Sequence, residues 1–339
     1  MAPAMSAGHR ALAYRIAVLA STCLGSVSCV VVVAHMREKW RARRRRIDVP
    51  GHGGGDWRHP APVATAGDDS LVPVLRRGFA AHWPAARKWA RAAFWTKELE
   101  ADVRCPIATT NEEVGATRKR TTTLRAYCRA LLSDDGGGDE RSKRGGAYLK
   151  QLDLTGLPAL MADLALRELF GARKPYLQPY LWIGPPGAVT GMHSDDEDNV
   201  LLCFRGTKTV LLVPPAARDD VYENGKYDEG TRCCDVDPSA PDLERHPRFR
   251  RAPVQVAVVA PGDALFIPRY WYHHVTTGGA ASSVSVNVFA SSRWEMIREG
   301  SWRAAGRFAH EQIGLWPECV CHDQRESARA GRPARGLKL

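Results

Sequence analysis

Several features that identify common protein classes are missing from this sequence of 339 residues. It holds only four asparagines, and none of them lies in an Asn-x-Ser/Thr sequon, which agrees with a reducing, cytosolic location. Its nine cysteines are odd in number and have no regular disulfide spacing. A Ser/His/Asp triad, a phosphate-binding glycine loop and a dinucleotide fingerprint are all missing, so nothing in the sequence indicates those enzyme classes.

Two cysteine groups leave zinc binding open as an alternative. Cys233 and Cys234 are adjacent, and Cys319, Cys321 and His322 lie close together near the end of the chain. Neither group has the CxxC spacing of a zinc knuckle, so the sequence gives zinc little support.

The net charge of +11 comes mostly from the two ends of the chain. Residues 1–50 hold nine basic and two acidic side chains, and residues 323–339 hold five and two. The remainder is nearly neutral, so a large basic face for nucleic acid is not indicated. We therefore do not expect a nucleic acid partner.

Residues 16–34 form an uncharged run long enough to cross a bilayer core. They follow a short tail, residues 1–15, and precede a cluster that includes Arg43, Arg44, Arg45 and Arg46. The positive-inside rule predicts a single N-terminal transmembrane anchor with the downstream domain in the cytosol. Because no acidic residue precedes Glu38, cleavage as a signal peptide or mitochondrial presequence, giving a lumenal or mitochondrial protein, is the alternative.

The rest of the chain divides by composition. Residues 35–70 are basic and then rich in glycine, proline and alanine, and we expect a flexible linker there. Residues 71–315 are expected to form one domain and residues 316–339 a basic, flexible tail. The domain should begin with a helical part that includes a short helix at residues 124–132, while residues 118–120 resemble a solvated loop.

Short apolar runs separated by glycine and proline predict a mainly β domain with flanking helices. The runs are residues 180–183, 200–204, 210–215, 254–259, 264–267 and 283–289. Runs of this length and punctuation are typical of strands in a sandwich or barrel, and the arrangement favours a double-stranded β-helix, or jelly roll. Residues 294–313 read as a C-terminal helix with Trp294, Ile297, Ala305, Phe308 and Ile313 on an apolar stripe.

Two histidines and one aspartate predict a metal site within this β region. His193 and Asp195 lie on a loop between two apolar runs, and His273 and His274 follow 80 residues later. Two imidazoles and one carboxylate can bind one face of a six-coordinate metal and leave three positions open, as non-haem Fe(II) oxygenases require. Adjacent residues of a strand point to opposite faces, so only one of His273 and His274 can reach the metal.

These segments resemble a JmjC-type cupin domain, and are most similar to the asparaginyl hydroxylase of hypoxia-inducible factor and related small JmjC hydroxylases. The matching motifs are Thr190-x-x-His193-x-Asp195, Asn199, Gly206-x-Lys208, Pro261-Gly-Asp-x-Leu-x-Ile-Pro268, Tyr270-Trp-x-His-His274 and Ser285-Val-Asn287. The resemblance extends over about residues 70–315, some three quarters of the chain.

The resemblance implies a role for each matching residue. His193, Asp195 and His273, rather than His274, would ligate Fe(II) and so be the catalytic residues. Further residues would bind the cosubstrate 2-oxoglutarate: Lys208 with Tyr148 and Thr190 at its distal carboxylate, and Asn199 and Asn287 near the metal. A cation and several donors suit a buried dicarboxylate. Lys150 stands where close relatives carry glutamine, which affects substrate contacts rather than the metal.

The resemblance also implies the activity: an Fe(II)- and 2-oxoglutarate-dependent dioxygenase that hydroxylates a protein side chain, consumes O2 and releases succinate and CO2. Demethylation of N-methyl-lysine, hydroxylation of a tRNA base and a non-catalytic scaffold or sensor are the alternatives. The segment 216–251 has no strand pattern and is our candidate for substrate contact. The C-terminal helix either packs on the barrel or forms a homodimer.

Overall fold

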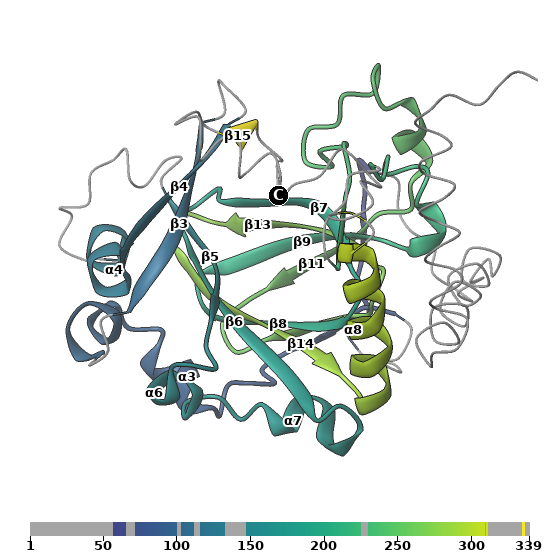
Figure 1. The fold of residues 1–339 in the computed structure, drawn as a ribbon. Coiled ribbons are helices and arrows are strands. Elements are labelled where there is room, and N and C mark those ends of the chain that lie inside the picture. Colours follow the sequence, from purple (N-terminus) through teal and green to yellow (C-terminus); the bar gives the residue numbers. More distant parts are fainter. Residues whose placement is uncertain are drawn as a thin grey trace, which may run out of the picture.

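The computed structural model describes residues 57–65, 72–99, 103–111, 116–132, 147–224, 230–308, 310 and 334–335. Two β-sheets face each other, short helices lie below and to the left of them, and the long helix α8 lies at the right (Figure 1). The mainly β fold with flanking helices is therefore confirmed.

The strands are β1 (Ala61–Pro62), β2 (Val74–Arg76), β3 (Arg104–Asn111), β4 (Ala116–Thr123), β5 (Tyr148–Asp153), β6 (Tyr176–Gly184), β7 (Val189–Asp195), β8 (Asp198–Arg205), β9 (Thr207–Val213), β10 (Thr231–Cys233), β11 (Gln255–Val259), β12 (Ala264–Ile267), β13 (Tyr272–Gly278), β14 (Ser283–Ser291) and β15 (Ala334–Arg335). The helices are α3 (Pro84–Lys88), α4 (Leu124–Leu132), α6 (Pro158–Met161), α7 (Arg167–Phe170) and α8 (Arg293–Phe308), with shorter turns η1 (Phe94–Glu98), η2 (Gly171–Arg173), η3 (Pro215–Ala217) and η4 (Pro247–Arg251).

The two sheets interleave strands that are distant in the sequence. The smaller has the order β1-β11-β9-β13-β7-β10 and the larger β15-β4-β3-β5-β6-β14-β8-β12-β2. All pairs within them are antiparallel except β1 with β11. Each of the six predicted strand runs forms a strand, as the jelly-roll interpretation requires.

Burial explains why the central strands read as nearly continuous apolar runs. One buried cluster fills the space between the sheets with side chains such as Leu201, Leu212 and Leu265. Another, including Leu202 and Val286, packs the other face of the larger sheet against the N-terminal helices. Because β8 is covered on both faces, it lacks the alternation of a half-exposed strand. In β14, serine or asparagine alternates with valine although both faces of the strand are mostly buried.

The helix predicted at residues 124–132 is confirmed as α4. Its first turn is capped by Thr123, whose hydroxyl oxygen accepts a hydrogen bond from the backbone N–H of Ala126 at 3.2 Å. Its apolar face, which includes Leu124, Cys128 and Leu132, is buried against the larger sheet. The N-terminal helical part therefore exists, although it is shared with a β-hairpin.

That hairpin corrects the interpretation of residues 118–120 as a solvated loop. They belong to β4, which pairs with β3 in a continuous register from Arg104↔Thr123 to Asn111↔Ala116. Backbone hydrogen bonds do not depend on side-chain polarity, so a basic stretch can form a strand wherever a neighbouring strand is available.

The predicted flexible linker is also wrong in part. Residues 57–65 lie within it, yet β1 pairs in parallel with β11 and Val63 is buried between the sheets. Trp57 packs against a third cluster, on the outer face of the smaller sheet. This cluster gathers Trp57, Val254 and Phe249 from separate parts of the chain, so the ordered domain begins before residue 71.

The apolar run at residues 16–34 lies outside the described residues, so its membrane-spanning helix stays a prediction. Within the part of the chain that the structure describes, no helix has the length and apolar character needed to cross a membrane.

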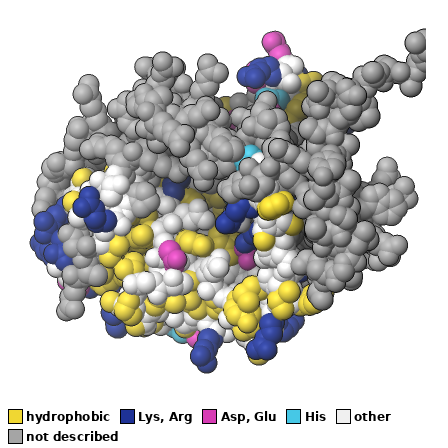
Figure 2. Space-filling model, viewed as in Figure 1, with side chains coloured by type: hydrophobic (Ala, Val, Ile, Leu, Met, Phe, Trp, Pro, Cys, Tyr) yellow, Lys and Arg dark blue, Asp and Glu magenta, His cyan; other side chains and the backbone are white. Residues whose placement is uncertain are grey.

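The C-terminal helix is confirmed over Arg293–Phe308 as α8. Ser292 and Glu295 form a capping box at its start: the Ser292 N–H donates to the Glu295 carboxylate at 2.8 Å and the Glu295 N–H donates to the Ser292 hydroxyl at 3.2 Å. The expected apolar stripe does not pack on the barrel, since Trp294 is 62% exposed, Ile297 51% and Phe308 49%. Apolar side chains are visible at the surface where α8 runs (Figure 2).

Candidate metal centre

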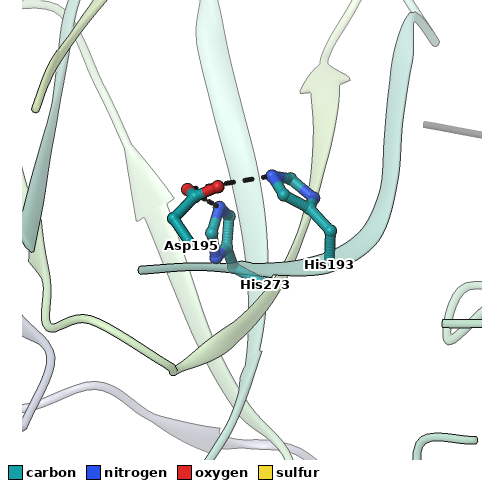
Figure 3. Close-up of side chains that lie close together, drawn as sticks. All are labelled: His193, Asp195 and His273. Atoms are coloured by element: carbon teal, nitrogen blue, oxygen red, sulfur yellow. Dashed lines mark ion pairs between the residues drawn. The ribbon is translucent and has the colours of Figure 1, made fainter. Parts of the chain in front are cut away.

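Three potential metal ligands meet at one end of the space between the sheets. His193 and Asp195 come from β7, and His273 comes from β13, whose backbone pairs with β7 at His273↔His193. One ligand atom of each lies within 4.8 Å of the others. Figure 3 shows the Asp195 carboxylate facing both imidazole rings, with Oδ2 at 3.4 Å from His273 Nε2 and 4.0 Å from His193 Nε2. Both β7 residues thus lie on a strand, not on the expected loop.

Hydrogen bonds fix both imidazoles in the orientation that a metal requires. The Nδ1 atom of His193 lies 2.7 Å from the Gly191 carbonyl oxygen, and that of His273 lies 3.0 Å from the Trp271 carbonyl oxygen. Since a carbonyl only accepts, each Nδ1 carries a proton, and in the neutral form of the ring the lone pair is then on Nε2. Both lone pairs face the Asp195 carboxylate.

The electrostatics favour a neutral imidazole at His273. Burial lowers its pKa well below the usual range, the neighbouring His193 ring lowers it further, and the bond to Trp271 only partly opposes this. Burial raises the pKa of Asp195, while His193 and the Thr231 hydroxyl act in the opposite direction. A buried carboxylate between two imidazole lone pairs lacks a cation, which a divalent metal supplies.

His274 does not join this group, as the alternation along a strand requires. Its ring is 1% exposed, and its Nε2 lies 3.9 Å from Asp237 on the far side of the smaller sheet. Burial lowers the pKa of His274 to about 4, with His193 also lowering it and Asp237 opposing. Among the described residues, His193, Asp195 and His273 are the one set with ligand spacing.

Lys208 lies deeper in the same space and is 1% exposed. Its ammonium donates to the Tyr148 hydroxyl at 3.1 Å and to the Thr277 hydroxyl at 2.9 Å, and Thr277 Oγ1 lies 3.1 Å from Ser283 Oγ. A lysine buried this deeply is costly, because among the described residues its ammonium meets the two hydroxyls and the face of the Tyr148 ring but no anion. An anionic ligand would offset that cost.

Several buried polar side-chain atoms on strands β6, β8 and β14 have no hydrogen-bond partner. Asn287 donates to the Asn199 side-chain oxygen at 3.0 Å, whereas the Asn199 Nδ2 has no hydrogen-bond partner. Trp182 Nε1 and Ser285 Oγ are also buried without a partner, and these two residues pair directly across β6 and β14. Unpaired buried donors of this kind indicate a ligand with several acceptor oxygens.

Sequence reasoning named some lining residues and missed others. Thr190 is buried on β7, and its expected contact with the cosubstrate stays a prediction. Thr277, Ser283 and Trp182 were not singled out, because isolated positions in strands carry no motif, and Ser285 stood in a matching motif but was given no role. The spacing of Ser285 from Asn287 was the available signal, since residues two apart on a strand share a face.

Because Gly184 has no side chain, the Tyr148 ring can pack against it. An added Cβ at position 184 would lie 2.7 Å from Tyr148 Cδ2, closer than real contacts permit. The glycine is therefore required for the placement of the tyrosine that contacts Lys208.

The segment 216–251 has two structural roles. Much of it covers the outer face of the smaller sheet through Val221, Val236 and Phe249. Its strand β10, missed in the sequence, pairs with the end of β7 next to the metal ligands. The Cys233–Cys234 pair belongs to no metal-binding group among the described residues, and the second cysteine group, at residues 319–322, lies outside them.

Comparisons with known proteins agree with this geometry. The sequence matches the cupin-like domain family over residues 69–296, more than half of the chain. It is 26% identical to lysine-specific demethylase 8 of Xenopus tropicalis over 220 residues, which are 63% of this chain and 47% of that protein. It is 26% identical to human bifunctional peptidase and (3S)-lysyl hydroxylase JMJD7 over 253 residues, 66% of this chain and 78% of that protein.

A third relative, human tRNA wybutosine-synthesizing protein 5, is 33% identical over 132 residues, 39% of each chain. The match to lysine-specific demethylase 8 spans only about half the length of that protein. With its jelly-roll fold, its His-Asp-His group and a match over most of the ordered domain, the chain belongs to the cupin-like domain family, as a JmjC-type member.

Proposed function

We propose that this protein is an Fe(II)- and 2-oxoglutarate-dependent dioxygenase that hydroxylates a protein side chain. The observation that carries the proposal is the pairing of a His-Asp-His group with a buried lysine in one space between the sheets. A metal site alone fits many functions, whereas a metal site with a buried cation fits an anionic cosubstrate that also chelates the metal.

The residues present fit both groups. His193, Asp195 and His273 would hold Fe(II), since two neutral imidazoles and one carboxylate suit this ion and leave coordination positions open. Lys208, with Tyr148 and Thr190, would receive the distal carboxylate of 2-oxoglutarate. Asn199 and Asn287 would line the metal-proximal end, where the unpaired Asn199 Nδ2 supports the assignment.

Bound Fe(II) supplies the redox chemistry by which 2-oxoglutarate and O2 are converted to succinate and CO2 while a substrate C–H bond is hydroxylated. The protein supplies position and shielding. The Gly191 and Trp271 carbonyl groups hold both imidazoles by Nδ1, and the apolar cluster between the sheets excludes water behind the site. Lys208 neutralises the cosubstrate charge throughout, so no proton has to move at that end.

The nature of the substrate is proposed from the relatives and the charge distribution. The names of two relatives refer to lysine, which supports a protein side chain as the target. N-methyl-lysine demethylation uses the same site and is the second candidate. A tRNA base, suggested by the third relative, has less support because the domain carries little excess positive charge. The complete ligand set argues against a non-catalytic scaffold.

Two partners outside the active site belong to the proposal. The uncharged run at residues 16–34 would anchor the protein in a membrane with its domain facing the cytosol, with targeting and cleavage as the alternative. A second copy of the chain would cover the exposed apolar residues Trp294, Ile297 and Phe308 of α8.

Succinate formation tests the activity. Purified protein with Fe(II), 2-oxoglutarate and a cell lysate should produce succinate and oxidise a lysate protein, and mass spectrometry would distinguish gain of one oxygen from loss of one methylene unit. His193→Ala and Asp195→Ala should abolish iron binding and turnover, whereas the exposed His82→Ala is the matched control. Full succinate production by Asp195→Ala would refute the proposal.

A further inference from the structure

Strand β10 brings one side chain to the metal ligand Asp195. The strand pairs antiparallel with the end of β7 in the register Thr231↔Asp195 and Cys233↔His193. Backbone bonds flank this register: Asp196 N–H donates to the Gly230 carbonyl at 2.9 Å, and Cys234 N–H donates to the Met192 carbonyl at 3.0 Å. Directly paired residues share a face of the sheet, so Thr231 and Asp195 point the same way.

This pairing makes the two oxygen atoms of the Asp195 carboxylate unequal. Oδ1 accepts a hydrogen bond from the Thr231 hydroxyl at 3.4 Å. Oδ2 is buried without a hydrogen-bond partner and is the oxygen that lies 3.4 Å from His273 Nε2 and 4.0 Å from His193 Nε2. The hydroxyl thus engages the other oxygen, not the one nearest the two imidazole nitrogens.

We propose that Thr231 is a positioning residue that holds Asp195 Oδ1, so that the carboxylate meets the metal through Oδ2 alone. The inference rests on the proposed metal site and extends it to a residue of the 216–251 segment. Its alternative is that Thr231 is an ordinary strand residue whose hydroxyl has no effect on the metal.

The number of ligand atoms explains why this would matter. With two imidazoles and one carboxylate oxygen, a six-coordinate metal keeps three positions, which suffice for a chelating 2-oxo acid and O2. A carboxylate free to rotate can chelate through both oxygens and take one of those positions. A hydroxyl that donates to Oδ1 opposes that rotation.

The surrounding structure holds β10 and Asp195 in place. The Tyr270 N–H donates to the Asp195 carbonyl at 2.7 Å, and Tyr270 keeps a left-handed φ of 70°. Gly230, at φ 85°, lies against α8, since an added Cβ would come within 3.1 Å of Arg303 Nη2. Arg303 in turn contacts Glu197, two residues beyond Asp195, at 2.9 Å. Thr231 is therefore set in a braced segment, not a free loop.

The test compares Thr231→Val, which keeps the shape but loses the hydroxyl, with Thr231→Ser, which keeps the hydroxyl. Calorimetry on the full chain under anaerobic conditions measures Co(II) binding first, and then binding of 2-oxoglutarate to the Co(II)-loaded protein. For Thr231→Val we expect Co(II) affinity within about threefold of wild type and 2-oxoglutarate affinity lower by about tenfold, the loss that one hydrogen bond accounts for. Thr231→Ser should bind 2-oxoglutarate as wild type does.

X-ray absorption of the Co(II)-loaded proteins gives a direct readout of the coordination. The valine variant should gain one oxygen ligand in the absence of 2-oxoglutarate, and the serine variant should not. Normal Co(II) and 2-oxoglutarate binding by Thr231→Val would overturn this inference and leave the proposed function intact. Failure of the wild-type protein to bind Co(II), or undiminished binding by His193→Ala, would overturn both.

Discussion

Replacing Lys208 tests the proposed cosubstrate directly. The side chain is 1% exposed, and its ammonium contacts the hydroxyl groups of Tyr148 and Thr277. We expect Lys208→Met, which keeps the length of the side chain and removes its charge, to raise the apparent KM for 2-oxoglutarate and to leave Fe(II) affinity nearly unchanged. Lys208 lies on β9, whereas the metal ligands lie on β7 and β13, so cosubstrate binding should be lost without loss of Fe(II) binding.

The magnitude follows from the burial. A carboxylate that enters this site without Lys208 would lose its water and gain only hydroxyl donors. Removing one partner of a buried ion pair costs about 3–5 kcal/mol, or roughly 100-fold to several-thousand-fold in affinity. In the absence of cosubstrate, the substitution should not destabilise the protein. The wild-type protein then carries a desolvated charge that meets no anion, so Lys208→Met should unfold at an equal or higher temperature than wild type.

The assay is succinate formation against 2-oxoglutarate concentration, together with thermal unfolding with and without the cosubstrate. Lys97→Ala, at an exposed lysine, is the matched control and should behave as wild type. Lys208→Arg should restore binding only in part, because the planar guanidinium is bulkier than an ammonium. An unchanged KM in Lys208→Met would show that another cation binds the distal carboxylate and would refute the reasoning.

Three further predictions concern residues around the site. His274→Ala should retain Fe(II) in a metal titration, because its ring faces Asp237 on the other side of the sheet; loss of iron would exchange the roles of the two histidines. Burial raises the pKa of Glu295, but the Ser292 N–H, Lys174 and Arg269 outweigh it and lower the pKa to about 2. Ionised Glu295 therefore stabilises the fold at any pH above the ordinary glutamate pKa, and this stabilisation is lost as the pH falls toward 2. Glu295→Gln should lower the unfolding temperature at pH 7, and the difference in unfolding temperature from wild type should shrink as the pH falls. Ile297→Asp, on the exposed face of α8, should convert a dimer to a monomer in sedimentation equilibrium, and a wild-type monomer would exclude dimerisation through α8.

Much of the β domain followed from local patterns. Runs such as residues 264–267 coincide with a strand because apolar content and bounding turns are properties of adjacent residues. Alternation of side chains along a strand showed that only one of His273 and His274 can reach the metal, and the family resemblance favoured His273. Residues 118–120 and 57–65 were misjudged because their strands exist only where β3 and β11 offer backbone partners.

The sequence by itself determined which residues could bind a metal and a dicarboxylate: His193, Asp195, His273 and Lys208 stand in motifs with recognisable spacing. Only the tertiary structure decided which residues surround them. Thr277 meets Lys208 across 69 positions, and Thr231 meets Asp195 across 36, through the register of paired strands. That register depends on how separate strands align, which no local pattern contains, because each strand's side chains fix its faces but not its neighbour.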